Sequence, residues 1–293
     1  MRGGIRLTDW IAVLPIYQDM FLAAVIACIL CGVVGTFVVV NRMVAVTGGI
    51  AHTMFGGVGF AYFAMSVLMV SWLTPMWGAL IFGLAAALIL SLTSKMKRIR
   101  QDSMIGVLWA LGMAAGVIFM SMMDRSVITP HSYEAILFGD ILFVGSSTLI
   151  MMAIVSAAIL VIVALLYREF QILTFDSANA HLLGVNVPLM RTILYVIITV
   201  ACVMVTNVVG IIMIIALMTI PVAMANLFLK NLKDTMIYAS VLSTVFAVFG
   251  LFLSIAFDVP PGATVVLVIG CAFVVAILLK YVMDRSAVQS SGT

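Results

Sequence analysis

Residues 21–40 read FLAAVIACILCGVVGTFVVV, a stretch without a single charged side chain. A helix that crosses a bilayer needs about 20 mostly apolar residues, so this stretch predicts a transmembrane helix near 18–40. Runs of the same kind recur along all 293 residues, which are 65% hydrophobic and 9% charged, with a mean hydropathy of +1.33. A soluble protein of this length needs far more surface charge. The composition therefore predicts an all-α bundle that crosses the membrane many times.

The apolar runs predict nine crossings. They fall near 18–40, 50–71, 74–94, 103–123, 146–167, 190–208, 210–229, 236–257 and 263–281. The division around 207–210 is very short, and a broken helix there would reduce the count to eight. We expect one transmembrane domain over residues 1–285 and a flexible cytoplasmic tail over residues 286–293.

Lysines and arginines divide unequally between the two sides of the nine-span arrangement. One side carries eleven of the 14, and the other carries only Arg2, Arg6 and Arg125. Because positive loops stay in the cytoplasm, the C-terminus is predicted to be cytoplasmic and the N-terminus external. Residues 1–20 contain several charged side chains and no small-residue cleavage site after an apolar stretch. We therefore expect no removed signal peptide.

The sulfur-containing residues offer two patterns that resemble metal sites. Cys28 and Cys31 have the spacing of a metal or redox pair, but all four cysteines lie inside apolar runs. We interpret them as small buried hydrophobes. The 22 methionines, with Met120, Met122 and Met123 close together, would suit copper, but flexible packing within the membrane is the interpretation we favour.

One histidine lies in a glycine-rich membrane segment, which reads TGGIAHTMFGGVG from Thr47. On a helix, Gly48 and Gly56 lie four residues either side of His52, on its own face. Ionisable side chains in a bilayer are costly and usually face a bundle interior or a pathway. We interpret His52 as the wall of a metal-ion route, with Thr47 and Thr53 as further candidate ligands. The alternative is a histidine that only hydrogen-bonds a neighbouring helix.

The external segment after the fourth predicted span carries Asp124, His131, Glu134 and Asp140. These residues could form an acidic mouth that attracts cations or receives a binding protein. An ordinary solvated loop has the same composition and is the interpretation we favour. Asp140 lies where the chain re-enters the membrane. We interpret it as a helix cap, and we favour this role over contact with an ion.

Two features of the sequence suggest moving parts. The loop before the sixth predicted span has Phe175, Ala178 and Leu182 at helical spacing and Gly184 where a C-cap belongs. This pattern predicts a short amphipathic helix that docks a soluble partner, although an interfacial helix without a partner fits it equally well. Pro221 lies inside an apolar span, where it frees a backbone carbonyl and permits a kink, either as a hinge or as a static bend.

Several catalytic and energy-coupling motifs are missing from the sequence. No phosphate-loop motif occurs, so the chain does not hydrolyse nucleotide by that route. His-Glu-x-x-His and Gly-x-Ser-x-Gly are also absent, which argues against an intramembrane enzyme. No acidic residue lies near the middle of a predicted span, which argues against a proton-driven carrier. The energy for uphill transport would have to come from another subunit.

Five stretches in chain order resemble motifs of the membrane permeases of zinc, manganese and iron ABC importers. They are Arg42-Met43 with the Gly-x-Ile-Ala-His stretch that ends at His52, Asp102-Ser103-Met104-Ile105-Gly106, Leu137-Phe138-Gly139-Asp140-Ile141-Leu142, Phe175-Asp176 with Ala180 and Gly184-Val185, and Gly210 through Ile220-Pro221-Val222-Ala223. The resemblance covers roughly residues 18–285. No single motif is diagnostic, but five in order are a specific signal.

This resemblance implies an all-helical permease of cobalamin-permease-like architecture that works as a homodimer in a prokaryotic cell membrane. Two cytoplasmic ATP-binding subunits would drive it, and an extracytoplasmic metal-binding protein would supply it. Phe175, Asp176, Ala180 and Gly184 would couple the chain to the ATPase, and His52 would contact the metal. No tightly bound cofactor is implied, because ATP belongs to the partner subunit and the metal is cargo.

One departure from the family motif bears on the metal. The motif has an aspartate where this chain has Gly48, so a dimer would offer two His52 side chains without the carboxylates. Neutral imidazole suits zinc, whereas manganese favours carboxylate oxygen. We therefore expect an imported divalent transition metal, with zinc ahead of manganese and iron. The alternatives are a permease for a metal chelate of siderophore or cobalamin type, and a metal channel or secondary carrier that acts alone.

Overall fold

The computed structural model describes residues 17–94, 100–124, 137, 139, 141, 144–176 and 179–291. Regular structure among these residues is entirely helical. The main elements are α2 (Gln18–Val40), α3 (Val44–Ser66), α4 (Pro75–Thr93), α5 (Gln101–Met122), α7 (Ser146–Leu165), α8 (Tyr167–Phe175), the 3-10 helix η3 (Ala180–Leu183), α9 (Val187–Val209), α10 (Ile211–Phe228), α11 (Leu232–Phe257) and α12 (Pro261–Ser291).

Within the described ranges, nine helices are long and apolar enough to cross a membrane, which confirms the predicted all-α polytopic fold. The second of them begins at Val44 rather than near residue 50. The polar and small residues at its start lower the local hydropathy, so the apolar run in the sequence begins later. These residues are nevertheless buried, and the Thr47 hydroxyl is satisfied within the helix by donating to the carbonyl of Met43 at 3.3 Å. At the other end of the chain, α12 continues through Ser291, so residues 286–291 are helical.

The break between α9 and α10 falls at Gly210, which has φ +86° and ψ 164°. Only glycine adopts that region readily, so the backbone turns there and two helices form instead of one long one. The eight-span alternative is therefore wrong for this part of the chain. Pro221 lies inside α10 and is buried, so its missing N–H leaves a gap in the hydrogen-bond ladder of that helix.

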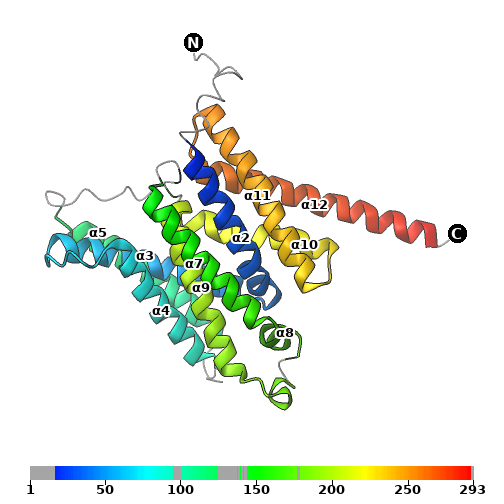
Figure 1. The fold of residues 1–293 in the computed structure, drawn as a ribbon, viewed down its shortest axis with the longest axis horizontal. Coiled ribbons are helices and arrows are strands. Elements are labelled where there is room, and N and C mark those ends of the chain that lie inside the picture. Colours follow the sequence, from blue (N-terminus) through cyan, green and yellow to red (C-terminus); the bar gives the residue numbers. More distant parts are fainter. Residues whose placement is uncertain are drawn as a thin grey trace, which may run out of the picture.

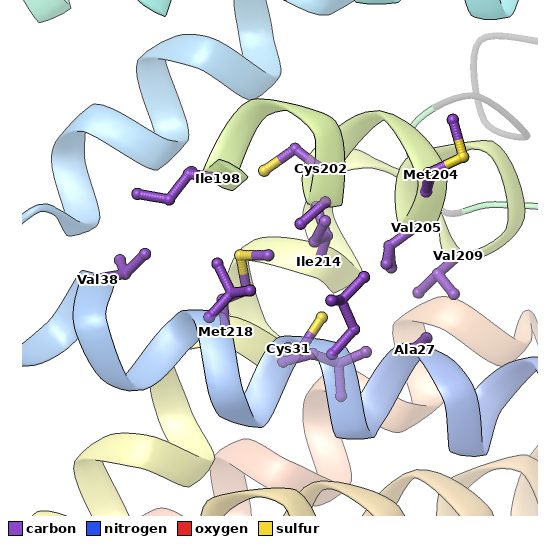
Figure 2. Close-up of a cluster of buried hydrophobic side chains, with 14 of the residues drawn as sticks. Ala27, Cys31, Val38, Ile198, Cys202, Met204, Val205, Val209, Ile214 and Met218 are labelled. Carbon is purple, nitrogen blue, oxygen red and sulfur yellow. The ribbon is translucent and has the colours of Figure 1, made fainter. Parts of the chain in front are cut away.

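Helix α2 lies at the centre of the bundle, in contact with α7, α9, α10 and α11. Figure 1 shows α2 beside α11, the trio α3, α4 and α5 at one end, and α12 projecting from the other. The side chains between α2, α9 and α10 are almost entirely aliphatic or sulfur-containing, and Cys31 and Cys202 lie among them (Figure 2).

The interpretation of the cysteines as small buried hydrophobes is confirmed for Cys28, Cys31 and Cys202, which have no exposed surface. It is wrong for Cys271, which lies on an exposed side of α12. That helix packs on α10 and α11 along one side only, so the rest of its surface is left uncovered within one protomer.

Candidate functional site: the seam between α3 and α5

The glycines of α3 allow neighbouring helices to approach main chain to main chain. A Cβ atom at Gly56 would lie 2.8 Å from the carbonyl oxygen of Gly112, and one at Gly59 would lie 2.5 Å from that of Gly116. Gly112 and Gly116 are four residues apart on α5, the small-xxx-small spacing that brings membrane helices together. The face of α3 that carries His52 is therefore filled by α5 within the protomer.

His52 lies in this seam with its ring partly exposed. Its imidazole stacks on the indole of Trp109, with ring centroids 4.1 Å apart and ring planes 17° apart. The imidazole Nδ1 lies 3.2 Å from the sulfur of Met113. Trp109 and Met113 are four residues apart on α5 and so lie on one face of that helix. This face is turned toward His52.

Gly48 faces the indole of Trp109, which leaves little space for a side chain at this position. A Cβ atom there would come within 3.1 Å of Cζ3 of Trp109, which is tighter than ordinary van der Waals contact. A side chain at position 48 would require the indole to shift by a few tenths of an ångström. The absence of the motif carboxylate at Gly48 and the presence of Trp109 are thus two parts of one packing arrangement.

The two threonines predicted as further ligands have other partners. The hydroxyl of Thr53 donates to the carbonyls of Gly49 at 2.8 Å and Leu108 at 3.2 Å, so it ties α3 to α5. Thr47 is completely buried, and its hydroxyl bonds the main chain of its own helix. Of the five residues predicted for the path, the structure brings His52 and Gly48 together around Trp109, whereas Thr47, Thr53 and Gly56 serve helix packing.

Among the residues that the structure describes, no group of three or more His, Cys, Asp or Glu side chains could hold a metal ion. His52 is therefore not part of such a group within the described part of the chain. Sequence reasoning missed Trp109 and Met113 as its neighbours. The signal that could have found them was the Gly112-x-x-x-Gly116 pair beside them, because it marks the face of α5 that meets another helix.

At the end of the seam where α3 and α5 both finish, α5 ends at Met122. The main-chain N–H of Asp124 donates to the hydroxyl of Ser66 at 3.3 Å, which joins the ends of α3 and α5. The Asp124 residue is exposed. His131, Glu134 and Asp140 lie outside the described residues, so the external mouth stays a prediction.

Residues 167–184 contain the side chains predicted to couple the chain to an ATPase, and we call them the coupling segment. The structure builds this segment from two short helical pieces rather than from the single helix expected. Helix α8 ends at Phe175, and η3 begins at Ala180. Gly184 follows η3 with φ +76°, the left-handed conformation predicted for a C-cap glycine. Asp176 accepts a hydrogen bond from the side-chain amide of Asn179 at 2.9 Å. A short polar side chain that bonds locally in this way competes with helix continuation, which is consistent with the break.

Large apolar side chains on this segment are exposed. Phe175 is 61% exposed and Leu182 is 74% exposed, whereas Ala180 is buried and anchors the turn. The carbonyl of Ala180 accepts from the N–H of Val185 at 2.9 Å. Ala178 of the expected apolar face lies outside the described residues.

A hydrogen-bonded link joins this segment to Asn41 at the end of α2, just before α3 begins. The side-chain amide of Asn41 donates to the Thr174 hydroxyl of α8 at 3.0 Å and to the carbonyl of Phe37 at 2.9 Å. The next residue, Arg42, has φ +57°, a conformation uncommon for residues other than glycine. The ring of Phe37 also packs on that of Phe170, with centroids 5.2 Å apart. A displacement of α8 would thus reach the loop from which α3 begins.

Comparisons with known proteins identify the family of the chain. The model of the ABC 3 transport family matches residues 14–280. An uncharacterized membrane protein of Synechocystis sp. is 35% identical over 263 residues, 90% of each chain. The manganese transport system membrane protein MntC of Listeria monocytogenes is 32% identical over 261 residues, 89% of each chain. The solved structure of PsaBC from Streptococcus pneumoniae in complex with Fab superposes with a TM-score of 0.80 at 27% identity, over 92% of this chain and 95% of that one. The chain belongs to the ABC 3 transport family and is the membrane permease subunit of a metal ABC importer, not itself an enzyme.

Proposed function

We propose that this permease imports zinc, and that the ion passes His52. The observation that carries the proposal is the partly exposed imidazole in the α3–α5 seam, with Gly48 and Trp109 where a carboxylate would otherwise sit. Imidazole nitrogen without carboxylate oxygen suits zinc better than manganese. Manganese is the second candidate, because the similar MntC protein of Listeria monocytogenes is named as a manganese transport protein. Iron ranks behind both.

The permease works as a homodimer that places two His52 side chains at one ion route. One imidazole cannot complete the tetrahedral coordination that zinc prefers, and a second copy supplies another. Trp109 supports this arrangement, because it stacks on His52 and still remains exposed, so a second copy can approach the imidazole there. An incomplete ligand set also suits a route that must release its ion.

Two cytoplasmic ATP-binding subunits drive transport, and an extracytoplasmic metal-binding protein delivers the ion. The ATP-binding subunits dock on the exposed apolar residues Phe175 and Leu182 of the coupling segment. Their movement displaces α8, and the hydrogen bond between Thr174 and Asn41 carries the displacement to the start of α3. The ion then leaves the neighbourhood of His52 toward the cytoplasm. Pro221 provides a flexible point in α10, where the hydrogen-bond ladder is interrupted.

The protein lies in a prokaryotic cell membrane with its C-terminus in the cytoplasm and its N-terminus outside. The distribution of lysine and arginine between the loops supports this orientation. It also puts the coupling segment on the side where ATP is available. Asp124 then lies at the external end of the seam, beside the external segment that carries His131, Glu134 and Asp140.

The test is uptake of radioactive zinc by cells that carry the complete importer with His52→Ala. We expect uptake to fall to background while the ATP-binding subunit still copurifies with the variant. Uptake at the wild-type rate would remove His52 from the route. Two further measurements separate the rivals: transport by the permease reconstituted alone would favour a channel or carrier, and uptake that requires an organic chelator would favour a chelate permease.

A further inference from the structure

The contact between Nδ1 of His52 and the sulfur of Met113 joins two atoms that can both donate electron pairs to a metal. They lie 3.2 Å apart on different helices, and both side chains are partly exposed. Nothing in the packing requires a sulfur at this position, because leucine or isoleucine would fill the same space beside Phe55 and Ala51 in the hydrophobic cluster that Met113 borders. A sulfur placed 3.2 Å from an imidazole nitrogen therefore suggests a chemical role.

The distance between the two atoms fits a shared ion. Zinc lies about 2.0–2.1 Å from a histidine nitrogen and about 2.3 Å from a sulfur ligand. With these bond lengths, angles of about 90–110° at the metal place the nitrogen and the sulfur about 3.1–3.6 Å apart. The 3.2 Å between His52 Nδ1 and Met113 Sδ lies inside that range, so one ion can reach both atoms with little movement of α3 or α5.

Trp109 leaves this approach open. A metal binds an imidazole nitrogen in the plane of the ring, whereas the indole covers one face of that ring at 4.1 Å. Stacking therefore fixes the direction of the ring without covering its nitrogens. The same indole leaves little space at position 48, since a Cβ atom there would lie 3.1 Å from Cζ3 and the ring would have to shift by a few tenths of an ångström. The site is held in a form that favours nitrogen and sulfur donors over oxygen donors.

We propose that Met113 Sδ and His52 Nδ1 together ligate the transported ion, and that this nitrogen–sulfur pair selects a d10 ion, Zn²⁺ or Cu⁺, over Mn²⁺. The proposal rests on the proposed passage of metal past His52 and names the ligand that sets its selectivity. Thioether sulfur and imidazole nitrogen are both accepted by zinc and copper, whereas manganese prefers oxygen ligands. Two copies of the chain supply two nitrogens and two sulfurs, enough for a tetrahedral site.

The experiment uses the permease copurified with its ATP-binding subunit, loaded in separate samples with Zn²⁺ and with Cu⁺. X-ray absorption at the metal edge reports the ligand atoms directly. We expect a sulfur neighbour at about 2.3 Å in the wild type, its loss in Met113→Leu, and its retention in Met104→Leu, the same substitution at another partly buried methionine of α5. The ion that shows the sulfur neighbour, Zn²⁺ or Cu⁺, is the one the site selects.

A competition measurement on the same samples gives the selectivity. Loss of outer partners of a metal site already weakens binding about 10–100-fold, so loss of a ligand in Met113→Leu should lower the preference for zinc or Cu⁺ over Mn²⁺ by about tenfold or more. Met104→Leu should leave the preference unchanged.

A wild-type spectrum without sulfur would overturn the proposal, as would an unchanged metal preference in Met113→Leu. Met113 would then only accept a hydrogen bond from Nδ1 and leave Nε2 to the ion. These results would not affect the proposed function if His52→Ala still abolished uptake. Normal uptake by His52→Ala, in contrast, would refute the proposed function itself.

Discussion

Gly59→Ala tests whether the seam between α3 and α5 is held together by direct contact of the two main chains. The added methyl carbon would lie 2.5 Å from the carbonyl oxygen of Gly116 and 2.8 Å from its Cα atom, whereas ordinary contact begins near 3.4 Å. The atoms in the way belong to the main chain and cannot rotate aside, so the helices must part locally by about 1 Å. A gap of that size forfeits a quarter to a half of each affected dispersion contact. Overpacking of this kind costs about 1–3 kcal/mol, partly offset by the better helix propensity of alanine, up to about 1 kcal/mol.

The assay is thermal unfolding of the purified permease in detergent, with zinc uptake measured in parallel. For a domain of about 150–250 residues, each kcal/mol of destabilisation shifts Tm by about 2–4 °C. We therefore expect Gly59→Ala to lower Tm by several degrees. Zinc uptake should also fall, because the added methyl group displaces His52 from Trp109 and Met113. Gly270→Ala is the matched control, because a methyl group there meets nothing within 4 Å and the residue lies in the middle of α12. We expect its Tm to be unchanged or slightly higher. Equal Tm values for Gly59→Ala and the wild type would refute the close-contact explanation of these glycines.

Three other variants test the link between α2 and α8 and the role of the buried cysteines. Asn41→Ala removes the hydrogen bond to Thr174, which is worth about 0.5–1.5 kcal/mol. We expect this variant, and Thr174→Val, to take up less zinc per ATP hydrolysed while ATPase activity persists. An unchanged ratio of zinc to ATP in both variants would show that this bond does not transmit movement. Cys28→Ala combined with Cys31→Ala should leave metal content and uptake unchanged, because both thiols are buried in the central core, although stability should fall from the lost volume. A lower metal content at equal protein yield would instead place the cysteines in a metal site.

Most of the fold follows from apolar length and composition. The run at 21–40 became α2, and each predicted crossing has a corresponding helix, because the cost of an unpaired backbone in lipid leaves few alternatives to a helix. Gly210 could only be suspected as a break, since hydropathy does not report φ. Its value of +86° explains why the chain forms two helices there.

The site was predicted less completely, for two physical reasons. The glycine pattern around His52 indicated a close approach to α3. The pattern could not distinguish a cargo ion from another helix as the neighbour. At Gly56 and Gly59 the neighbour is α5. The contacts of His52 with Trp109 and Met113 join residues about 60 positions apart in sequence, and no local pattern encodes such a pairing.

The prediction of a single helix in the coupling segment was wrong, because the periodicity of apolar residues carries no information about local side-chain hydrogen bonds. Phe175 and Leu182 fit a single apolar stripe, yet Asp176 bonds Asn179, and the chain leaves the helix at that point. Short polar side chains that compete with the backbone are visible in the sequence, but whether they win depends on what packs around them.

The most direct measurement is the location of the metal ion in a structure of the complete importer, trapped with zinc and identified by anomalous scattering. We predict metal density within bonding distance of a His52 ring nitrogen, in the space between two copies of the permease. Density elsewhere in the bundle, or a His52 ring that faces the acyl chains away from the second copy, would contradict the route proposed for this protein.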